Sequence, residues 1–168
     1  MNYWITTDTH FGHESILEWV GRPPNHEGLI LKRLKAHLTK NDVLIHLGDV
    51  SWRNDAYWHE QLTVIPAKRK YLVRGNHDNK SLSWYLDNGW DFVGDMISLN
   101  IYGKVILFSH KPIRDNGYDL NIHGHFHNTD SRRHEPELVA IKNNRQRLIM
   151  LEHNYMPVSL RRFVFKNK

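Results

Sequence analysis

The 168-residue sequence contains no cysteine. That absence excludes disulfides, thiolate zinc sites and cysteine nucleophiles, so any metal ion must be held by nitrogen and oxygen ligands. No apolar run approaches the ~20 residues that a bilayer-spanning helix needs, and the N-terminus opens into a strand-like segment with no basic region before it. We therefore expect a cytoplasmic protein without a membrane partner.

Length and composition suit one domain over residues 1–168, because 40% of the chain is hydrophobic. Lys and Arg exceed Asp and Glu by five (23 − 18). This excess favours anionic partners, but a solvated basic surface would give the same balance, so it does not establish nucleic-acid binding. The thirteen histidines supply ample nitrogen ligands for a metal.

Five short apolar runs each end in a cluster of Asp, His or Asn. The runs are 3–7, 43–47, 71–73, 105–108 and 120–122, and the clusters that follow them begin at Asp8, Gly48, Gly75, His110 and Gly124. Short runs rich in Val, Ile and aromatic residues predict buried strands. Because ligands of open α/β sheets bind beyond the carboxyl ends of the strands, we expect one end of one sheet to gather all five clusters.

Helical segments alternate with these runs in the first half of the chain, which predicts parallel strands. Helices are expected from an Asn25 cap over about 27–38, from Asn54 or Asp55 to about Leu62, and from Ser81 to about Leu86. Beyond residue 92 the pattern favours strands. It places a hairpin turn at Gly103, another turn at Asn143-Asn144, and one or two strands within 147–165, with Pro157 at a strand start or edge.

The polar clusters suit hydrolysis of a phosphoester by two cations about 3.5–4 Å apart, which hold the phosphate and a hydroxide between them. Asp49, which follows a glycine that allows a sharp turn, is the natural bridging carboxylate. One metal would take Asp8, His10 and a late histidine, and the other Asn76, His110 and a second late histidine. Residues two apart on a strand share a face, so each Asp-x-His or His-x-His pair would point into one cleft.

In type and order, the five motifs resemble those of the calcineurin-like metallophosphoesterase superfamily. They are Asp8-Thr9-His10, Gly48-Asp49, Gly75-Asn76-His77-Asp78, His110 and Gly124-His125-Phe126-His127. The segments Asp8–His13, Arg22-Pro23 and Tyr155–Leu160 also resemble small bacterial and phage members. The resemblance implies an α/β fold, a sandwich of two mixed β-sheets flanked by α-helices.

The resemblance also implies roles by position. Asp8, His10 and His127 would bind the first metal, Asn76, His110 and His125 the second, and Asp49 both. His77 would contact the phosphate and protonate the leaving group, and Asp78 would orient His77 and raise its basicity. Such ligands suit Mn²⁺, Fe or Zn²⁺, with manganese as the first choice.

Several further residues have two interpretations. Arg22 and His13 follow the first motif and are candidate substrate contacts, although Arg22 can equally be a surface residue before a proline turn. His46 lies inside an apolar run and is expected to be a hydrogen-bonded core residue. Trp52 follows Asp49 on the same loop, which makes it the tryptophan best placed to stack on a nucleobase.

We predict a metal-dependent phosphodiesterase acting on a nucleotide, a nucleic-acid end or another small phosphodiester. The His-x-His ending and the Gly-Asn-His-Asp form resemble the phosphodiesterase branches, and the missing Asp-Arg-Gly after Asp49 argues against a protein phosphatase. The alternatives are a phosphomonoesterase, a nuclease, or a non-catalytic metal-binding scaffold. The complete ligand set together with His77 disfavours the scaffold.

Overall fold

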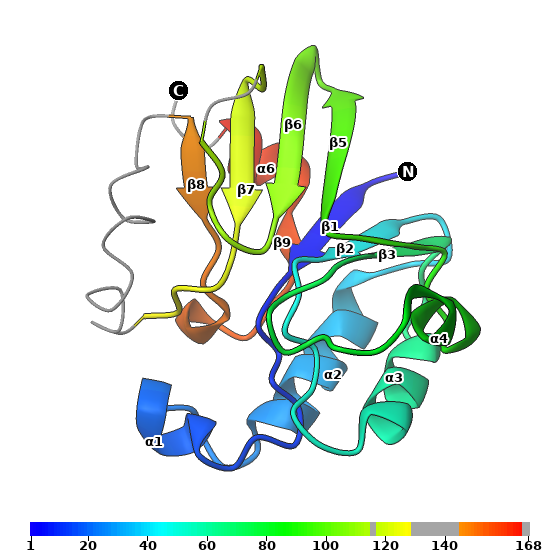
Figure 1. The fold of residues 1–168 in the computed structure, drawn as a ribbon, viewed down its shortest axis with the longest axis vertical. Helices are drawn as coiled ribbons and strands as arrows, with labels where there is room; N and C mark the ends of the chain where they lie inside the picture. The colour runs from blue at the N-terminus through cyan, green and yellow to red at the C-terminus, as the bar shows by residue number, and fades with distance from the viewer. Residues whose placement is uncertain (115–116, 129–144, 166–168) are drawn as a thin grey trace.

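A computed structural model describes residues 1–114, 117–128 and 145–165, which form two β-sheets with helices around them (Figure 1). The larger sheet has the strand order β4-β3-β2-β1-β9 and the smaller one β5-β6-β7-β8. The strands are β1 (Tyr3–Thr6), β2 (Val43–His46), β3 (Arg69–Val73), β4 (Phe92–Gly94), β5 (Met96–Ile101), β6 (Lys104–Ser109), β7 (Leu120–His123), β8 (Gln146–Leu148) and β9 (Val158–Ser159).

Both sheets are mixed, which confirms the predicted α/β fold class. In the larger sheet β1 to β4 run parallel and β9 pairs antiparallel with β1. In the smaller sheet β5 pairs antiparallel with β6, while β6, β7 and β8 run parallel. The hairpin at Gly103 is confirmed, since Ile101 pairs with Lys104 across it.

The strand β2 is buried along its whole length because it has a hydrophobic layer on each face. Val43 and Ile45 belong to the core between the two sheets, together with Phe108 of β6. Leu44 points the other way, into the core beneath the helices, where it joins Leu34. Burial on both faces is the reason that this run is continuously apolar and shows no polar alternation.

The helices of the first half are α1 (Ile16–Val20), α2 (His26–His37), α3 (Asp55–Thr63) and α4 (Leu82–Asp87), which lie in the lower half of Figure 1. The three longer ones match the predictions to within about a residue or two. Ser81 caps α4, because its side chain accepts the backbone N–H of Trp84 at 3.1 Å. The short α1 was not predicted, since five residues are too few to show a helical period.

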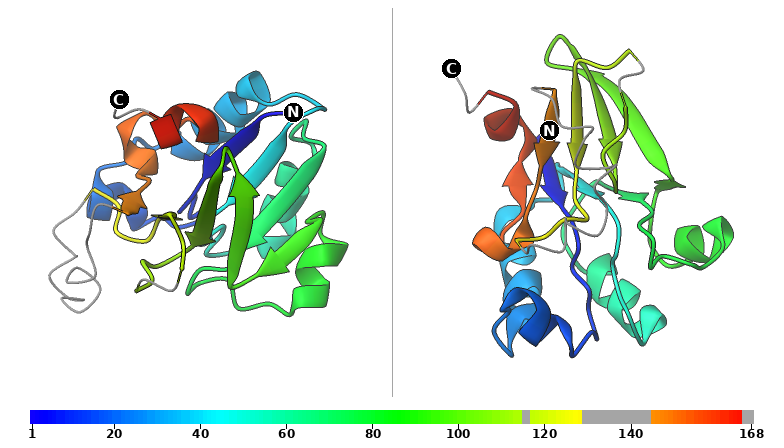
Figure 2. Two further views of the ribbon diagram at one scale, coloured as in Figure 1. Left: turned by 90° about the horizontal axis from the view of Figure 1, so that it is seen from above. Right: turned by 60° about the vertical axis from the view of Figure 1, so that its left-hand side comes forward.

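The C-terminal segment corrects one prediction. Strands were expected over 147–165, and β8 and β9 do lie there, with Pro157 just before the edge strand β9. Residues Leu160–Phe165, however, form helix α6, which lies beside β1 in both views of Figure 2. Leu160 and Val164, four residues apart, both enter the core between the sheets, which requires helical spacing. The predicted turn at Asn143-Asn144 lies outside the described residues.

The polar clusters come from two sheets, and the expectation of a single sheet is wrong. The strands β1, β2 and β3 belong to the larger sheet, whereas β6 and β7 belong to the smaller one. Their carboxyl ends converge where the two sheets meet, so the clusters face one another across this junction.

No helix within residues 1–114, 117–128 and 145–165 has the length and apolar character to cross a membrane.

Candidate metal centre

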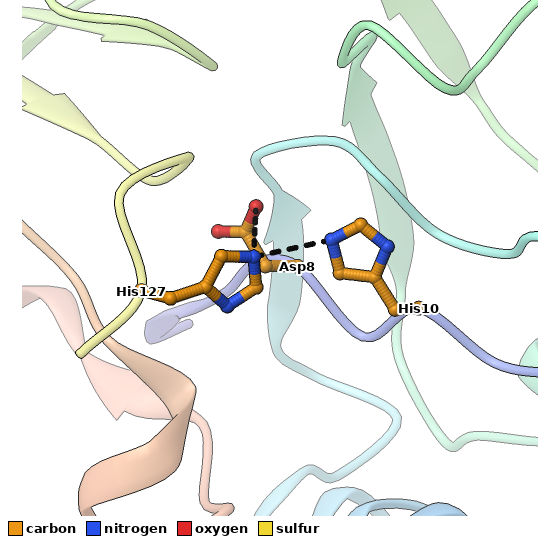
Figure 3. A group of neighbouring side chains, drawn as sticks. All are labelled: Asp8, His10 and His127. Carbon is orange, nitrogen blue, oxygen red and sulfur yellow. Dashed lines mark hydrogen bonds and ion pairs between the residues drawn. The ribbon is translucent and has the colours of Figure 1, made fainter. Parts of the chain in front are cut away.

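Three side chains from two sheets form a first group of potential metal ligands. They are Asp8, His10 and His127, and one ligand atom from each lies within 4.8 Å of the others. Figure 3 shows the three side chains turned toward one another. The Nε2 atom of His127 lies 3.2 Å from Nε2 of His10 and 3.8 Å from Oδ1 of Asp8.

A second group gathers around His110, at the end of β6. It contains Asp49, His110 and His125, whose ligand atoms also lie within 4.8 Å of one another. The Nε2 atom of His110 is 3.3 Å from Oδ2 of Asp49 and 3.1 Å from Nδ1 of His125. Asn76 joins this group, because its Oδ1 atom lies 3.1 Å from the same nitrogen.

One carboxylate oxygen connects the two groups. Oδ2 of Asp49 lies 3.6 Å from Nε2 of His10 in the first group and 3.3 Å from Nε2 of His110 in the second. The other oxygen, Oδ1, accepts the backbone N–H of His77 at 2.9 Å, which fixes the plane of the carboxylate. An oxygen shared in this way between both groups is the arrangement required of a bridging ligand.

Five of the seven predicted ligands have left-handed backbone conformations. Their φ angles are 48° at Asp8, 46° at His10, 55° at Asp49, 73° at His125 and 42° at His127. These residues lie beyond the ends of their strands, so the expectation based on strand spacing is wrong, although Asp8 and His10 do converge in one group, while His125 and His127 each join a different group. Non-glycine residues in this conformation cost energy and concentrate at functional sites, where surrounding contacts hold them.

The motif glycines allow loops from different strands to touch. A Cβ atom on Gly75 would overlap Oδ1 and the backbone nitrogen of Asp49. A Cβ atom on Gly124 would overlap Oγ1 of Thr7 and Oδ2 of Asp8. Glycine at these two positions therefore brings the loop after β3 against Asp49, and the loop after β7 against Asp8.

The outer nitrogens of two candidate ligands have hydrogen-bond acceptors. Nδ1 of His110 lies 2.8 Å from the carbonyl oxygen of Leu47, and Nδ1 of His127 lies 2.9 Å from Oε1 of Glu152. An acceptor at Nδ1 selects the tautomer whose Nε2 lone pair is free for a metal. With carboxylate, amide and imidazole atoms converging, the residues fit divalent metal ions.

Glu152 is a functional candidate that the sequence did not reveal. It lies in the short 3₁₀ turn Leu151–His153, and no motif or spacing links it to His127, 25 residues earlier. Burial alone would raise the pKa of Glu152, but the hydrogen bond with His127 and the charge of Arg22 lower this pKa to about 2. Glu152 is therefore an anion held against the first ligand group.

Arg22 has a different place from the one predicted. Its guanidinium donates to the carbonyl oxygens of Asp8 at 2.6 Å and Thr9 at 2.7 Å, and to Oε1 of Glu152 at 2.5 Å. Its side chain has no exposed surface. Because its donors are occupied behind the first ligand group, Arg22 is not available to a phosphate in this geometry and instead supports the Asp8 loop.

Asp78 also differs from its predicted role. Its carboxylate accepts backbone N–H groups from Asp49 at 2.7 Å, Val50 at 3.1 Å and Gly75 at 2.8 Å. Among the described contacts, none joins this carboxylate to the His77 ring. Burial raises the pKa of Asp78 to about 6. Its structural effect is to fasten the two motif loops together, while the orientation of His77 comes from other contacts.

The His77 ring lies at the mouth of the site. Its side chain is 33% exposed, and its Nε2 atom is 3.9 Å from Oδ2 of Asp49. The Trp52 ring lies 4.6 Å from it, centroid to centroid, and 4.3 Å from the half-buried His13 ring. His77 thus has solvent access and can meet a substrate, and His13 stands at the rim beyond Trp52.

His46 lies in the core, at the end of β2. His46 is fully buried, lies 3.0 Å from the Thr9 hydroxyl through Nε2, and accepts the Gly48 N–H through Nδ1, as expected of a core residue. Burial lowers the pKa of His46 to about 3, so His46 is neutral.

The candidate ligand His110 is shifted in the opposite direction. Burial by itself would lower the pKa of His110, but its hydrogen bond to Asp49 and the charge of Asp8 outweigh burial and raise this pKa to about 9.

Comparison with known proteins agrees with this arrangement. A family model described as calcineurin-like phosphoesterase matches residues 1–167. The chain therefore belongs to the calcineurin-like phosphoesterase family, whose members use divalent metals, and the two ligand groups described above are candidate positions for such ions.

Two similar proteins match almost the whole chain, and a third shares its fold over part of it. Protein MJ1445 of Methanocaldococcus jannaschii is 28% identical over 170 residues, which span 94% of this chain and 86% of that protein. The crystal structure of AQ665 from Aquifex aeolicus is 30% identical, with a TM-score of 0.77 and 97% of both chains covered. The nuclease MPE of Pseudomonas putida shares the fold at 21% identity, with a TM-score of 0.52 over 74% of this chain and 61% of that one.

Proposed function

We propose that the protein is a metal-dependent phosphodiesterase with a dinuclear centre, acting on a nucleotide or another small phosphodiester. The observation that carries the proposal is the position of Asp49, whose Oδ2 atom lies within 3.6 Å of an imidazole nitrogen from each ligand group. A single-metal site would not need a carboxylate at this point. The membership of the family supports hydrolysis of a phosphoester bond.

In this proposal, the residues divide between two metals. Asp8, His10 and His127 hold the first, Asn76, His110 and His125 hold the second, and Asp49 is shared. Bound divalent ions at these positions would neutralise phosphoryl charge and lower the pKa of a water molecule. The ligands suit manganese, iron or zinc, with manganese as the first choice for an assay.

His77 acts in the proposal as the general acid for the leaving oxygen. Its backbone N–H is tied to Asp49, so the ring is held close to the centre, while its partial exposure leaves it open to a substrate. A positioned acid of this kind contributes roughly 10²–10⁴-fold to the rate. Asp78 contributes indirectly, by fixing the loop from which His77 projects.

Two surfaces adjoin the candidate centre, which favours a diester over a monoester. A pocket of about 240 Å³ adjoins the second group and is lined in part by Arg74, Asn76 and Lys111. The Trp52 ring lies against the His77 ring, and the His13 ring lies against Trp52. A phosphodiester carries substituents on two oxygens, and these two surfaces give each substituent a place beside the phosphate.

The test compares bis-p-nitrophenyl phosphate with p-nitrophenyl phosphate as substrates of metal-stripped protein refilled with Mn²⁺. We expect faster diester hydrolysis that depends on metal, with His77→Ala retaining metal but losing about 10²–10⁴-fold in kcat. Asp49→Asn should lose bound metal and turnover together.

Other outcomes would redirect the proposal. Preference for the monoester would indicate a phosphomonoesterase, and full activity of Asp49→Asn would overturn the dinuclear scheme. Salt-sensitive degradation of long DNA or RNA would indicate a nuclease, because binding along many phosphates weakens steeply with salt. Absence of turnover with both metals bound would leave a non-catalytic scaffold.

A further inference from the structure

Three aromatic rings extend from His77 across the rim of the candidate centre. The His77 and Trp52 centroids are 4.6 Å apart, those of Trp52 and His13 are 4.3 Å apart, and those of His13 and Trp19 are 6.2 Å apart. Trp52 is 44% exposed and Trp19 is 72% exposed. We call Trp52, His13 and Trp19 the aromatic platform.

The platform is built on the same loops as the metal ligands. The backbone N–H of Trp52 donates to the carbonyl oxygen of Phe11 at 2.9 Å. The N–H of Phe11 donates in turn to the carbonyl oxygen of Val50 at 3.0 Å. These bonds join the loop that carries Asp49 to the loop that carries His10. The backbone of Trp52 is therefore held against the two loops that carry the ligands, and the N–H of His13 donates to the carbonyl oxygen of His10 at 3.1 Å.

Other tryptophans in the chain show what a packing role looks like. Trp58 stacks on the fully buried Phe11 at 4.9 Å, and the buried Trp90 donates its Nε1–H to His59 at 2.8 Å. Trp52 instead keeps much of its surface in water beside the candidate catalytic His77, and Trp19 is more exposed still, beside His13. Single exposed apolar residues are common on protein surfaces. Adjacent exposed apolar residues beside a candidate site indicate a binding surface.

We propose that the aromatic platform binds the base of a nucleobase-bearing phosphodiester, which places the phosphate at the metal ligands beside His77. This inference rests on the proposed function and names its substrate class. Every nucleobase has a planar face, and stacking it on an aromatic side chain contributes about 1–3 kcal/mol, or roughly 5- to 150-fold in affinity. The platform therefore selects nucleotide-containing substrates without demanding one particular base.

The kinetic test uses two esters with the same leaving group, thymidine 5′-(p-nitrophenyl phosphate) and methyl p-nitrophenyl phosphate. The readout is the ratio of their kcat/KM values, because a general effect on chemistry cancels in that ratio. We expect the ratio to fall about 5- to 150-fold in Trp52→Ala and by a smaller factor in Trp19→Ala. Trp52→Phe, which keeps an aromatic face, should restore most of it.

Phe92→Ala is the matched control, because Phe92 is 43% exposed but lies on β4, at the far edge of the larger sheet. Its ratio should equal that of the wild type. An unchanged ratio in both Trp52→Ala and Trp19→Ala would overturn the platform. A ratio that falls equally in Phe92→Ala would show that the preference for the thymidine ester does not depend on the platform, and would also overturn it.

A binding experiment separates failure of this inference from failure of the proposed function. Calorimetric titration of the Mn²⁺-loaded protein compares adenosine 5′-monophosphate with ribose 5-phosphate, which differ only in the base. Tighter binding of the nucleotide that is lost in Trp52→Ala supports the platform, even if neither ester is hydrolysed. Equal affinities in the wild type would contradict the platform, even if diesterase activity is present.

Discussion

Arg22 and Glu152, 130 positions apart in the chain, form an ion pair whose side chains are 0% and 2% exposed. Glu152 Oε1 also lies 2.9 Å from Nδ1 of His127, so the pair stands directly behind a candidate metal ligand. A buried ion pair is weak evidence for stability, because desolvation offsets much of the attraction. Its placement indicates instead that it sets the tautomer and orientation of His127.

Replacement of Glu152 by glutamine should weaken metal binding at the first group. The glutamine amide has nearly the same shape but no charge, and its NH₂ group can face Nδ1 of His127 and favour the wrong tautomer. We expect affinity for Mn²⁺ to fall by about 10- to 100-fold, the usual effect of losing such a partner. Titration of metal-stripped protein with Mn²⁺ measures this change.

Glu60→Gln serves as the control for that experiment, since Glu60 is exposed on α3. Its Mn²⁺ affinity should match that of the wild type. If Glu152→Gln binds Mn²⁺ as tightly as the wild type does, then Glu152 has no positioning role toward His127.

Asp78→Asn should destabilise the protein as well as disturb the site. The carboxylate accepts three backbone N–H groups, and an asparagine amide would turn an NH₂ group toward at least one of these donors. We expect the free energy of unfolding to fall by about 1–3 kcal/mol, the cost of leaving a buried partner unsatisfied. Urea unfolding of the metal-free protein provides the measurement.

The comparison with Asp87→Asn isolates this effect, because Asp87 is exposed at the end of α4. That control should unfold at the wild-type urea concentration. A fully stable Asp78→Asn that has lost only turnover would favour the role expected from the sequence, in which Asp78 acts on the His77 ring.

Gly124→Ala should separate the loop after β7 from Asp8. The added methyl group would overlap Oγ1 of Thr7 and Oδ2 of Asp8, so one loop must move, and His125 and His127 would move with it. We expect loss of metal binding and a lower melting temperature.

In contrast, Gly28→Ala, in α2 with open space around its Cα, should stabilise the protein by up to about 1 kcal/mol. Equal behaviour of the two variants in thermal unfolding would refute the close-approach argument.

The buried His59 should make the protein less stable in acid. Its Nδ1 atom accepts the Nε1–H of Trp90, and burial lowers the pKa of His59 from 6.5 to about 4. As the pH falls, the unfolded chain therefore protonates His59 at a higher pH than the folded protein does. The stabilisation that neutral His59 gives to the folded protein is present above about pH 6.5 and is lost as the pH falls toward 4. Its full size is about 3 kcal/mol.

Urea unfolding between pH 4 and 7 tests this, with His59→Phe as the comparison. The variant keeps a buried ring but cannot titrate, so its free energy of unfolding should fall less steeply with acid, even though its stability at pH 7 is lower. Parallel curves for the two proteins would show that His59 does not contribute to the acid sensitivity.

Much of the fold followed from local patterns. The strand runs ending near Asp8, Asp49 and Gly75 were predictable because burial on both faces demands continuous apolar residues. The helices α2, α3 and α4 were predictable because their lengths show a period or a cap. The segment that forms helix α6 was predicted to contain a strand. Leu160–Phe165 is only six residues long, and Phe163 and Phe165 are hydrophobic as well, so the helical spacing of its two core residues is hard to recognise in the sequence.

The sequence by itself determined which candidate ligands meet, because the types and order of the motif residues resemble those of a known family and the motif glycines allow loops to pack at strand ends. Only the tertiary structure decided how they meet. The spacing of Asp8 and His10 suggested a strand, but the pair converges through left-handed residues held by neighbouring loops. The contact of Glu152 with Arg22 and His127 depends on where the last segments pack after both sheets have formed. No local pattern encodes that contact, because the energy that fixes it comes from burial between segments far apart in the chain.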